Sequence, residues 1–143
     1  MNEQHVDEAL KGNEKIEEYI GMLQKEPSPE MLSVVLTAIR RRMKAGGQMI
    51  VAVDADGVSD LKVQIMELPD GERWLPAFTS FEEQMKGKSS VMSTFLGDIG
   101  QLLDMALKEE SVSGLLINPW DKTLRLDKTL IRIIRGENEG AGS

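Results

Sequence analysis

The chain has 143 residues, of which 41% are hydrophobic and 29% charged, a composition typical of one soluble globular domain. Acidic residues (24) outnumber basic ones (17), and the net charge of −7 argues against nonspecific nucleic-acid binding, which needs a basic surface. The absence of cysteine excludes disulfides, thiolate zinc sites, cysteine nucleophiles and direct sulfur transfer.

The two ends of the chain show no targeting signal. The first residues are acidic where a signal peptide is basic, and no apolar run approaches the roughly 20 residues of a membrane-spanning helix. We therefore expect a cytoplasmic protein that does not bind membranes. Residues 136–143 are small, polar and glycine-rich, which predicts a flexible tail. We expect the domain to span residues 1–135, with its ordered core at about 13–135.

The N-terminal third predicts two helices that pack as an antiparallel pair. Apolar residues over 6–23 recur at steps of three and four, as they do on one helix face. We expect the ordered helix to begin near Asn13 and to end before Pro27. Ser28-Pro29-Glu30 combines a hydroxyl cap, a proline at the first helical position and an acid in the first turn, so it predicts a second helix. Gly46-Gly47 ends that helix.

Strand patterns begin after the second helix. Residues 49–53 form a nearly continuous apolar run, which is typical of a strand buried on both faces. Residues 61–66 alternate between apolar and polar side chains and predict one half-buried strand. Residues 73–78 predict a third strand, in which Pro76 favours an edge or irregular position because it lacks an amide donor.

The second half of the chain alternates short helices and strands. Thr79-Ser-Phe-Glu82 and Asp98-x-x-Gln101 have capping-box spacing and predict helices, and Asp127 is expected to cap a last helix. Apolar runs predict short strands over 91–95, 114–117 and 124–126. These elements predict an α+β fold in which two N-terminal helices precede a mixed β-sheet with interspersed helices, in a single compact domain.

The acidic residues near position 56 form the most site-like cluster. An EF-hand loop beginning at Asp54 would need further oxygen ligands at fixed steps, and Val58 and Ile65 occupy two of those positions. We interpret Asp54, Asp56 and Asp60 as an acidic hairpin turn. The alternative is a divalent metal site in an irregular loop, which would make the protein a metal-assisted hydrolase or transferase.

No other group of residues assembles a catalytic set. His5 is the only histidine and has no partner at metal-ligand or base spacing. No serine lies in a Gly-x-Ser-x-Gly elbow, and Gly97-Asp-Ile-Gly100 follows no phosphate-loop pattern. We interpret Arg40-Arg41-Arg42 as a solvated last turn rather than a site for a phosphate or an acidic partner. We therefore expect no catalytic residues, no metal and no cofactor.

Most of the few aromatic residues lie in the second half of the chain. Trp74 and Phe78 are four residues apart and so share one face of a strand. The aromatic residues either fill the core, or Trp74 and Trp120 keep partial exposure and line a groove. The residues of this candidate binding surface are Arg73, Trp74, Phe78, Thr79, Ser80, Asn118 and Trp120.

Two motifs in this order resemble a known family. Asp70-Gly-Glu-Arg-Trp-Leu-Pro-Ala-Phe-Thr-Ser-Phe-Glu-Glu83 is followed, after a helix, by Gly114-Leu-Leu-Ile-Asn-Pro-Trp120. Between about Met31 and Ile134 the chain resembles the SseB N-terminal domain family, whose pattern is a strand ending in Pro-x-Phe-Thr-Ser before an acidic helix, and a later strand ending in Asn-Pro. The resemblance implies a bacterial, cytoplasmic α+β domain without established catalytic residues. It places the family pattern on Pro76, Phe78, Thr79, Ser80, Asn118 and Pro119.

These observations predict a non-enzymatic binding or interaction domain. Its partner is expected to be a protein or a small ligand, and neither nucleic acid nor a membrane. There are two alternatives. One is the metal-assisted enzyme described above, and the other is a self-associating scaffold in which the N-terminal helices form a two-fold interface.

Overall fold

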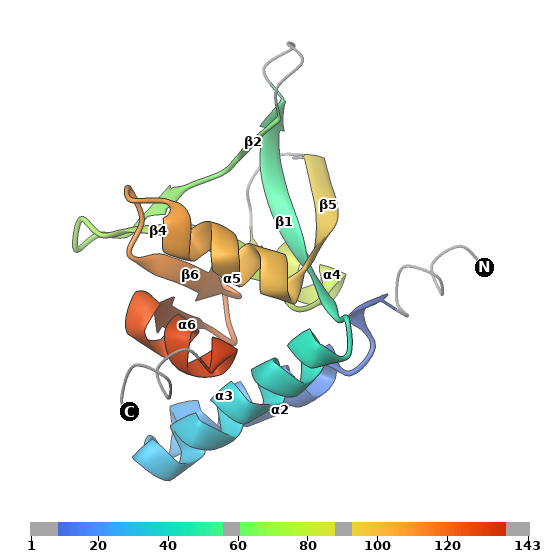
Figure 1. Cartoon of the computed structure of the whole chain (residues 1–143), viewed down its shortest axis with the longest axis vertical. Helices are drawn as coiled ribbons and strands as arrows, with labels where there is room; N and C mark the ends of the chain where they lie inside the picture. The colour runs from blue at the N-terminus through green and yellow to red at the C-terminus, as the bar shows by residue number, and fades with distance from the viewer. Residues whose placement is uncertain (1–8, 56–60, 88–92, 137–143) are drawn as a thin grey trace.

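The computed structural model of the chain describes residues 9–55, 61–87 and 93–136 (Figure 1). The helices are α2 (Asn13–Lys25), α3 (Pro29–Lys44), α4 (Phe81–Met85), α5 (Ile99–Lys108) and α6 (Lys128–Arg135). The strands are β1 (Gln48–Ala55), β2 (Leu61–Val63), β3 (Met66–Glu67), β4 (Arg73–Phe78), β5 (Ser93–Asp98), β6 (Gly114–Ile117) and β7 (Leu124–Asp127). The predicted α+β fold, with two N-terminal helices before a mixed sheet with interspersed helices, is confirmed.

The described strands form one mixed sheet. Its order is β2-β1-β4-β6-β7, while β3 pairs with β4 and β5 pairs with β1. β4 and β6 run parallel, and the other pairs are antiparallel. Because β4 and β6 are parallel, their carboxyl ends meet at the same edge of the sheet.

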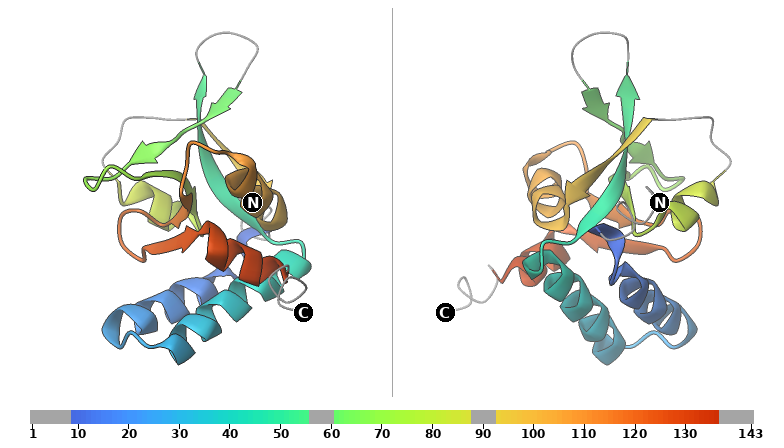
Figure 2. Two further views of the ribbon diagram at one scale, coloured as in Figure 1. Left: turned by 60° about the vertical axis from the view of Figure 1, so that its left-hand side comes forward. Right: turned by 90° about the vertical axis from the view of Figure 1, so that its right-hand side faces the viewer.

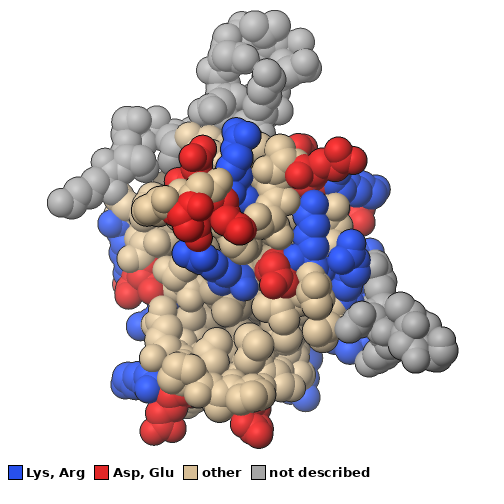
Figure 3. Space-filling model, turned by 90° about the vertical axis from the view of Figure 1, so that its left-hand side faces the viewer, with Lys and Arg blue, Asp and Glu red and all other residues tan. Residues whose placement is uncertain are grey.

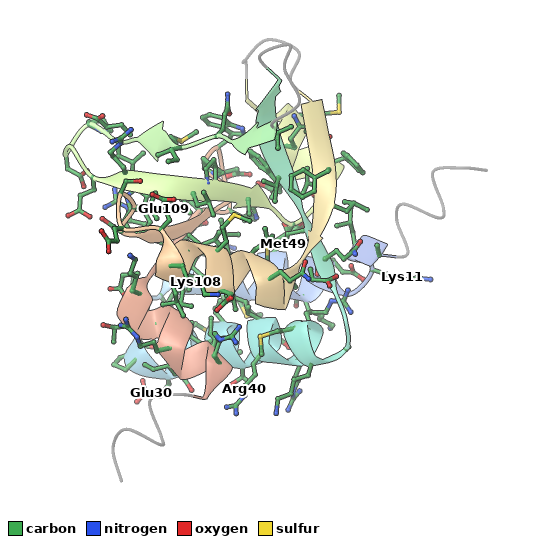
Figure 4. All side chains as sticks on the ribbon, turned by 45° about the horizontal axis from the view of Figure 1, so that its top comes forward. Lys11, Glu30, Arg40, Met49, Lys108 and Glu109 are labelled. Atoms are coloured by element: carbon green, nitrogen blue, oxygen red, sulfur yellow. The ribbon has the colours of Figure 1, made fainter. Side chains whose placement is uncertain are left out.

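The main core lies between one face of the sheet and helices α2, α3, α5 and α6. Met49 of β1, Leu75 of β4 and Ile117 of β6 point into it and are at most 3% exposed. Figure 4 shows Met49 inside the molecule, whereas Lys11, Glu30 and Arg40 lie at its periphery. α2 and α3 lie side by side at the end of the molecule away from β2 (Figures 1 and 2).

A smaller cluster covers the opposite face of the sheet. Leu10, Ile50 and Phe78 are its buried members, and Phe81 of α4 and Leu96 of β5 pack against them. Residues alternate between the two faces of a strand, so Trp74 shares this face with Phe78, as predicted. The aromatic rings are therefore concentrated on the side of the sheet that the large helices leave open.

Local sequence signals correctly placed several ends of elements. α2 begins at Asn13 as predicted, after Gly12 in the left-handed region. The Ser28 hydroxyl accepts a hydrogen bond from the Met31 amide (3.0 Å), and the Asp127 carboxylate accepts one from the Leu130 amide (2.9 Å). Both side chains thus satisfy amides of a first helical turn, which is the physical basis of their preference for that position.

Two capping signals correctly predicted a helix, but the capping bonds expected of Thr79 and Asp98 do not form. Ser80, and not Thr79, caps α4 by accepting a hydrogen bond from the Glu83 amide (3.1 Å). Asp98 stands at the N-cap of α5, but its carboxylate makes no capping bond and instead accepts from the Gln48 side chain (3.1 Å). Thr79 and Asp98 both have partners distant in sequence, and spacing alone carries no information about them.

The predicted strand over 61–66 is divided in two. Leu61–Val63 pairs with β1, whereas Met66–Glu67 pairs with β4. The predicted strand over 91–95 corresponds to β5, which continues to Asp98 and pairs with β1 from Ser93 onward, while residues 91 and 92 lie outside the described residues. In both regions the choice of partner strand sets the boundary, because pairing needs residues far away in the sequence.

Of the two positions predicted for Pro76, the edge strand is wrong and the irregular position is confirmed. β4 is an inner strand, with β6 on one side and β1 and β3 on the other. On that second side β3 pairs with Arg73 and Trp74, and β1 pairs with Ala77 and Phe78. Pro76 falls in the gap between these two partners, so its missing amide removes no ladder hydrogen bond.

Charged side chains are unevenly distributed over the face drawn in Figure 3. They gather over its upper part, and the lower part, formed by α6 and the turn between α2 and α3, carries them only at its margin. None of the described helices is long and apolar enough to cross a membrane. The predicted tail after Gly136 and the candidate residues His5, Asp56 and Asp60 lie outside the described residues.

Candidate binding surface at the carboxyl ends of β4 and β6

The two family-like motifs end at adjacent points of the sheet. The Asn118 amide, directly after β6, donates to the carbonyl oxygen of Ala77 in β4 (2.8 Å). This parallel pairing brings Thr79 and Ser80 beside Asn118 and Trp120, although 39 residues separate Thr79 from Asn118. Asn118 turns the chain with φ of 51°, in the left-handed region that asparagine tolerates better than most residues.

Thr79 and Asn118 form a reciprocal pair that is fully buried. The Thr79 amide donates to Asn118 Oδ1 (2.9 Å), and Asn118 Nδ2 donates to Thr79 Oγ1 (2.9 Å). The Thr79 hydroxyl in turn donates to a carboxylate oxygen of Glu17 in α2. Because both residues are 0% exposed and bonded on every side, they support the surface instead of presenting groups to a ligand.

The same network extends to the N-terminal helices. Asn13 Nδ2 donates to the carbonyl oxygens of Thr79 (3.0 Å) and Gln48 (2.8 Å). Asn13 Oδ1 accepts from Arg42 Nε (3.0 Å), which ties α2 to α3. Asn13, Glu17 and Arg42 were not predicted as members of this cluster, since no local pattern distinguishes them from solvated helix residues.

Trp120 presents its ring at this edge of the sheet. Its exposed fraction is 40%, and its ring centroid lies 6.5 Å from that of Phe78 with a tilt of 31°. The Trp120 ring also packs against the backbone of Gly87, where any Cβ would collide with the indole. Glycine is therefore required at position 87, because the backbone approaches the ring too closely for a side chain.

Charged groups hold the loop that carries Trp120. Lys86 Nζ lies 2.6 Å from Glu83 and 2.7 Å from Asp121, so it links α4 to that loop. The hydrogen bonds to Asp121 and Glu83 raise the pKa of Lys86, and the bond from Lys86 lowers the pKa of Asp121. Gln24 of α2 also donates to the Asp121 carbonyl oxygen (3.0 Å). No sequence pattern indicates this arrangement, because its members come from three separate segments.

Arg73 and Trp74 lie at the other end of β4. The strand runs from Arg73 to Phe78, which separates its ends by about 17 Å. Trp74 does not keep the predicted partial exposure: it is 3% exposed and lies beneath the guanidinium of Arg125, 5.7 Å from its ring centroid. Trp74 and Trp120 therefore do not line one groove, because they are at opposite ends of the β4–β6 pair.

The metal alternative receives no support from the described residues. Among residues 9–55, 61–87 and 93–136, no group of three or more His, Asp or Glu side chains could hold a metal ion. Of the predicted acidic cluster, Asp54 lies in β1, where only the backbone is described.

Comparison with known families agrees with the geometry of the two motifs. The family described as the SseB protein N-terminal domain matches residues 16–132, which is most of the chain. The chain belongs to this family. The SseB match spans α2 to α6 and thus includes β4, β6 and the loops that follow them. None of the curated proteins or solved structures that were compared with this SseB domain matches it.

Proposed function

We propose that this SseB domain is a non-enzymatic protein-interaction module whose contact surface centres on Trp120. The observation that carries the proposal is a tryptophan 40% exposed and yet held in place by Phe78 and Gly87. Tryptophan is the residue type most enriched at interaction hot spots, because its large ring offers apolar area and an N–H donor together.

The fixed position of the Trp120 loop favours binding. Lys86, Asp121 and Gln24 restrict the loop, so little conformational entropy is lost when a partner covers the ring. Met85, two residues before Gly87, is 75% exposed and adds a flexible apolar side chain. Of the candidate residues, Phe78, Thr79, Ser80 and Asn118 support this surface from below. Arg73 and Trp74 lie at the other end of β4 and are not part of it.

Site-specific photocrosslinking tests this proposal. A photoreactive amino acid at Met85 in the full chain should give a discrete adduct with a protein partner in the lysate of the native host. The same group at Ile133, which is 38% exposed on α6, is the matched control and should not give that adduct.

The Trp120→Ala variant then tests the role of the ring. It should retain the wild-type circular dichroism spectrum and should weaken binding to the crosslinked partner by about 30-fold or more, as expected of a hot spot worth about 2 kcal/mol. Thr79→Val is the structural control: it should lower stability but leave the affinity of the folded protein close to that of the wild type. Equal affinity of the Trp120→Ala variant, or its failure to fold, would contradict the proposal.

A further inference from the structure

The helix pair α2–α3 has an apolar groove on the side facing away from the core. Its core-facing side is occupied by residues such as Ile16, Ile20 and Ile39, which are 0% exposed. A second apolar set lies along the groove between the helices, where no other described element covers it (Figure 2). The members of this set are Tyr19, Met22, Met31, Val34 and Ala38, of which Tyr19 and Ala38 also pack against the main core.

The dimensions of the groove fit another helix. It consists of a hollow of about 480 Å³ and an adjoining one of about 390 Å³, and Val34 lines both. Met22 is 45% exposed and Val34 is 40% exposed, so the groove leaves apolar area in contact with water. The 16 residues of α3 span about 24 Å, which is room for a partner helix of about four turns.

One end of the groove is cationic. Lys15, Arg41 and Arg42 line the larger hollow, and no acidic residue lines it. Arg42 is fixed by its bond to Asn13, whereas the exposed side chain of Arg41 makes no hydrogen bond or ion pair with another described residue. Figure 4 shows Lys11, just before α2, and Glu30, in the first turn of α3, at opposite ends of the helix pair. The smaller hollow is lined by Lys25, Glu26 and Glu30, so the two ends of the groove differ in charge.

We propose that this groove binds an amphipathic helix of a partner protein whose apolar stripe is flanked by acidic residues. The stripe would pack on Tyr19, Val34 and Ala38, and the carboxylates would meet Arg41 and Lys15. Helix-in-groove recognition uses this combination of spaced apolar anchors and flanking charges. The cationic end is confined to a few residues of a chain with a net charge of −7, which favours an acidic peptide over nucleic acid or a membrane.

Another apolar groove, between α3 and α6, provides a contrast. It is lined by Leu32, Leu36, Leu130 and Ile133. Arg40 is its only charged lining residue, so it lacks the cluster of cations that would select an acidic partner. Its residues therefore serve as controls for nonspecific apolar binding.

A displayed library of random peptides, each as long as α3, tests the proposal even though the natural partner is unidentified. The library is selected against the full chain and counter-selected against the Val34→Asp variant. Enriched peptides should have apolar residues at steps of three and four together with Asp or Glu. A synthetic representative should bind the wild type in calorimetric titration, and Val34→Asp or Arg41→Glu should weaken it by about tenfold or more.

Matched variants show whether the effect belongs to this groove. Ile133→Asp and Arg132→Glu, both on the exposed side of α6, should leave the affinity for the peptide unchanged. Trp120→Ala should also leave it unchanged, which makes this test independent of the proposed Trp120 surface. The proposal is overturned if no peptide is enriched, if the enriched peptides lack acidic residues, or if Val34→Asp binds them as tightly as the wild type. It is also overturned if light scattering detects a dimer that Val34→Asp dissociates, because a second copy would then fill the groove.

Discussion

At the scale of single residues, Trp74 has a buried indole N–H that makes no hydrogen bond with any described residue. Trp74→Phe removes this donor and keeps an aromatic ring beneath Arg125, so the free energy of unfolding should stay within about 1 kcal/mol of the wild type. Trp74→Ala should cost about 3–5 kcal/mol, because it removes the ring and leaves a cavity. Urea denaturation of both variants measures the difference. A Phe variant as unstable as the Ala variant would mean that the indole N–H has a partner.

Asn118 meets two requirements at once. Its backbone adopts φ of 51°, and its side-chain amide both accepts from and donates to Thr79. Glycine would satisfy only the first requirement. Glutamine has the same amide group on a longer side chain, so its oxygen and nitrogen would not lie where they bond the amide and the hydroxyl of Thr79. The Asn-Pro end of β6 therefore has a structural role. The residue that is exposed for binding at this point is Trp120.

At the scale of elements, two aspartates stand at helix N-caps but differ in their contacts. Asp127 accepts a bond from the Leu130 amide at the start of α6, whereas Asp98 makes no capping bond at the start of α5. Asp127→Ala should therefore lower the free energy of unfolding by about 1 kcal/mol, and Asp98→Ala should lower it by less. Chemical denaturation of the two variants at neutral pH measures this order. A larger loss for Asp98→Ala would show that its bond to Gln48 matters more than a cap.

Local and non-local signals account for how much of the fold could be predicted. The helix start at Ser28 and the buried run at 49–53 depend on near neighbours, and both were predicted correctly. The division of residues 61–66 between two partner strands depends on distant residues, and it was not. The same holds for the candidate site. The sequence identified the aromatic motif, but only the parallel pairing of β4 with β6 shows that Trp120 and Trp74 lie apart.

At the scale of the whole molecule, the salt bridges of Lys86 join α4 to the Trp120 loop. Lys86→Met should leave the buried carboxylate of Glu83 without its amine partner, which costs about 1–3 kcal/mol of unfolding free energy at pH 7. Lys108→Met is the matched control, because its pair with Asp104 is largely exposed and such pairs contribute little. The Trp120 loop should lose its fixed position in the Lys86 variant only.

The pKa shifts of this salt bridge set the pH range of the effect. Lys86 lowers the pKa of Asp121 below 3.8, so the stability that the folded state gains from this carboxylate is fully present above pH 3.8 and is lost as the pH falls through the lowered pKa. The raised pKa of Lys86 has the opposite sign: its contribution is fully present below pH 10.5 and is lost as the pH rises beyond that value. The stability difference between wild type and Lys86→Met should therefore be constant from about pH 5 to 10 and should shrink towards pH 2. Urea denaturation across this range measures it, and a difference that persists undiminished at pH 2 would mean that the Lys86 side chain acts through packing instead of charge.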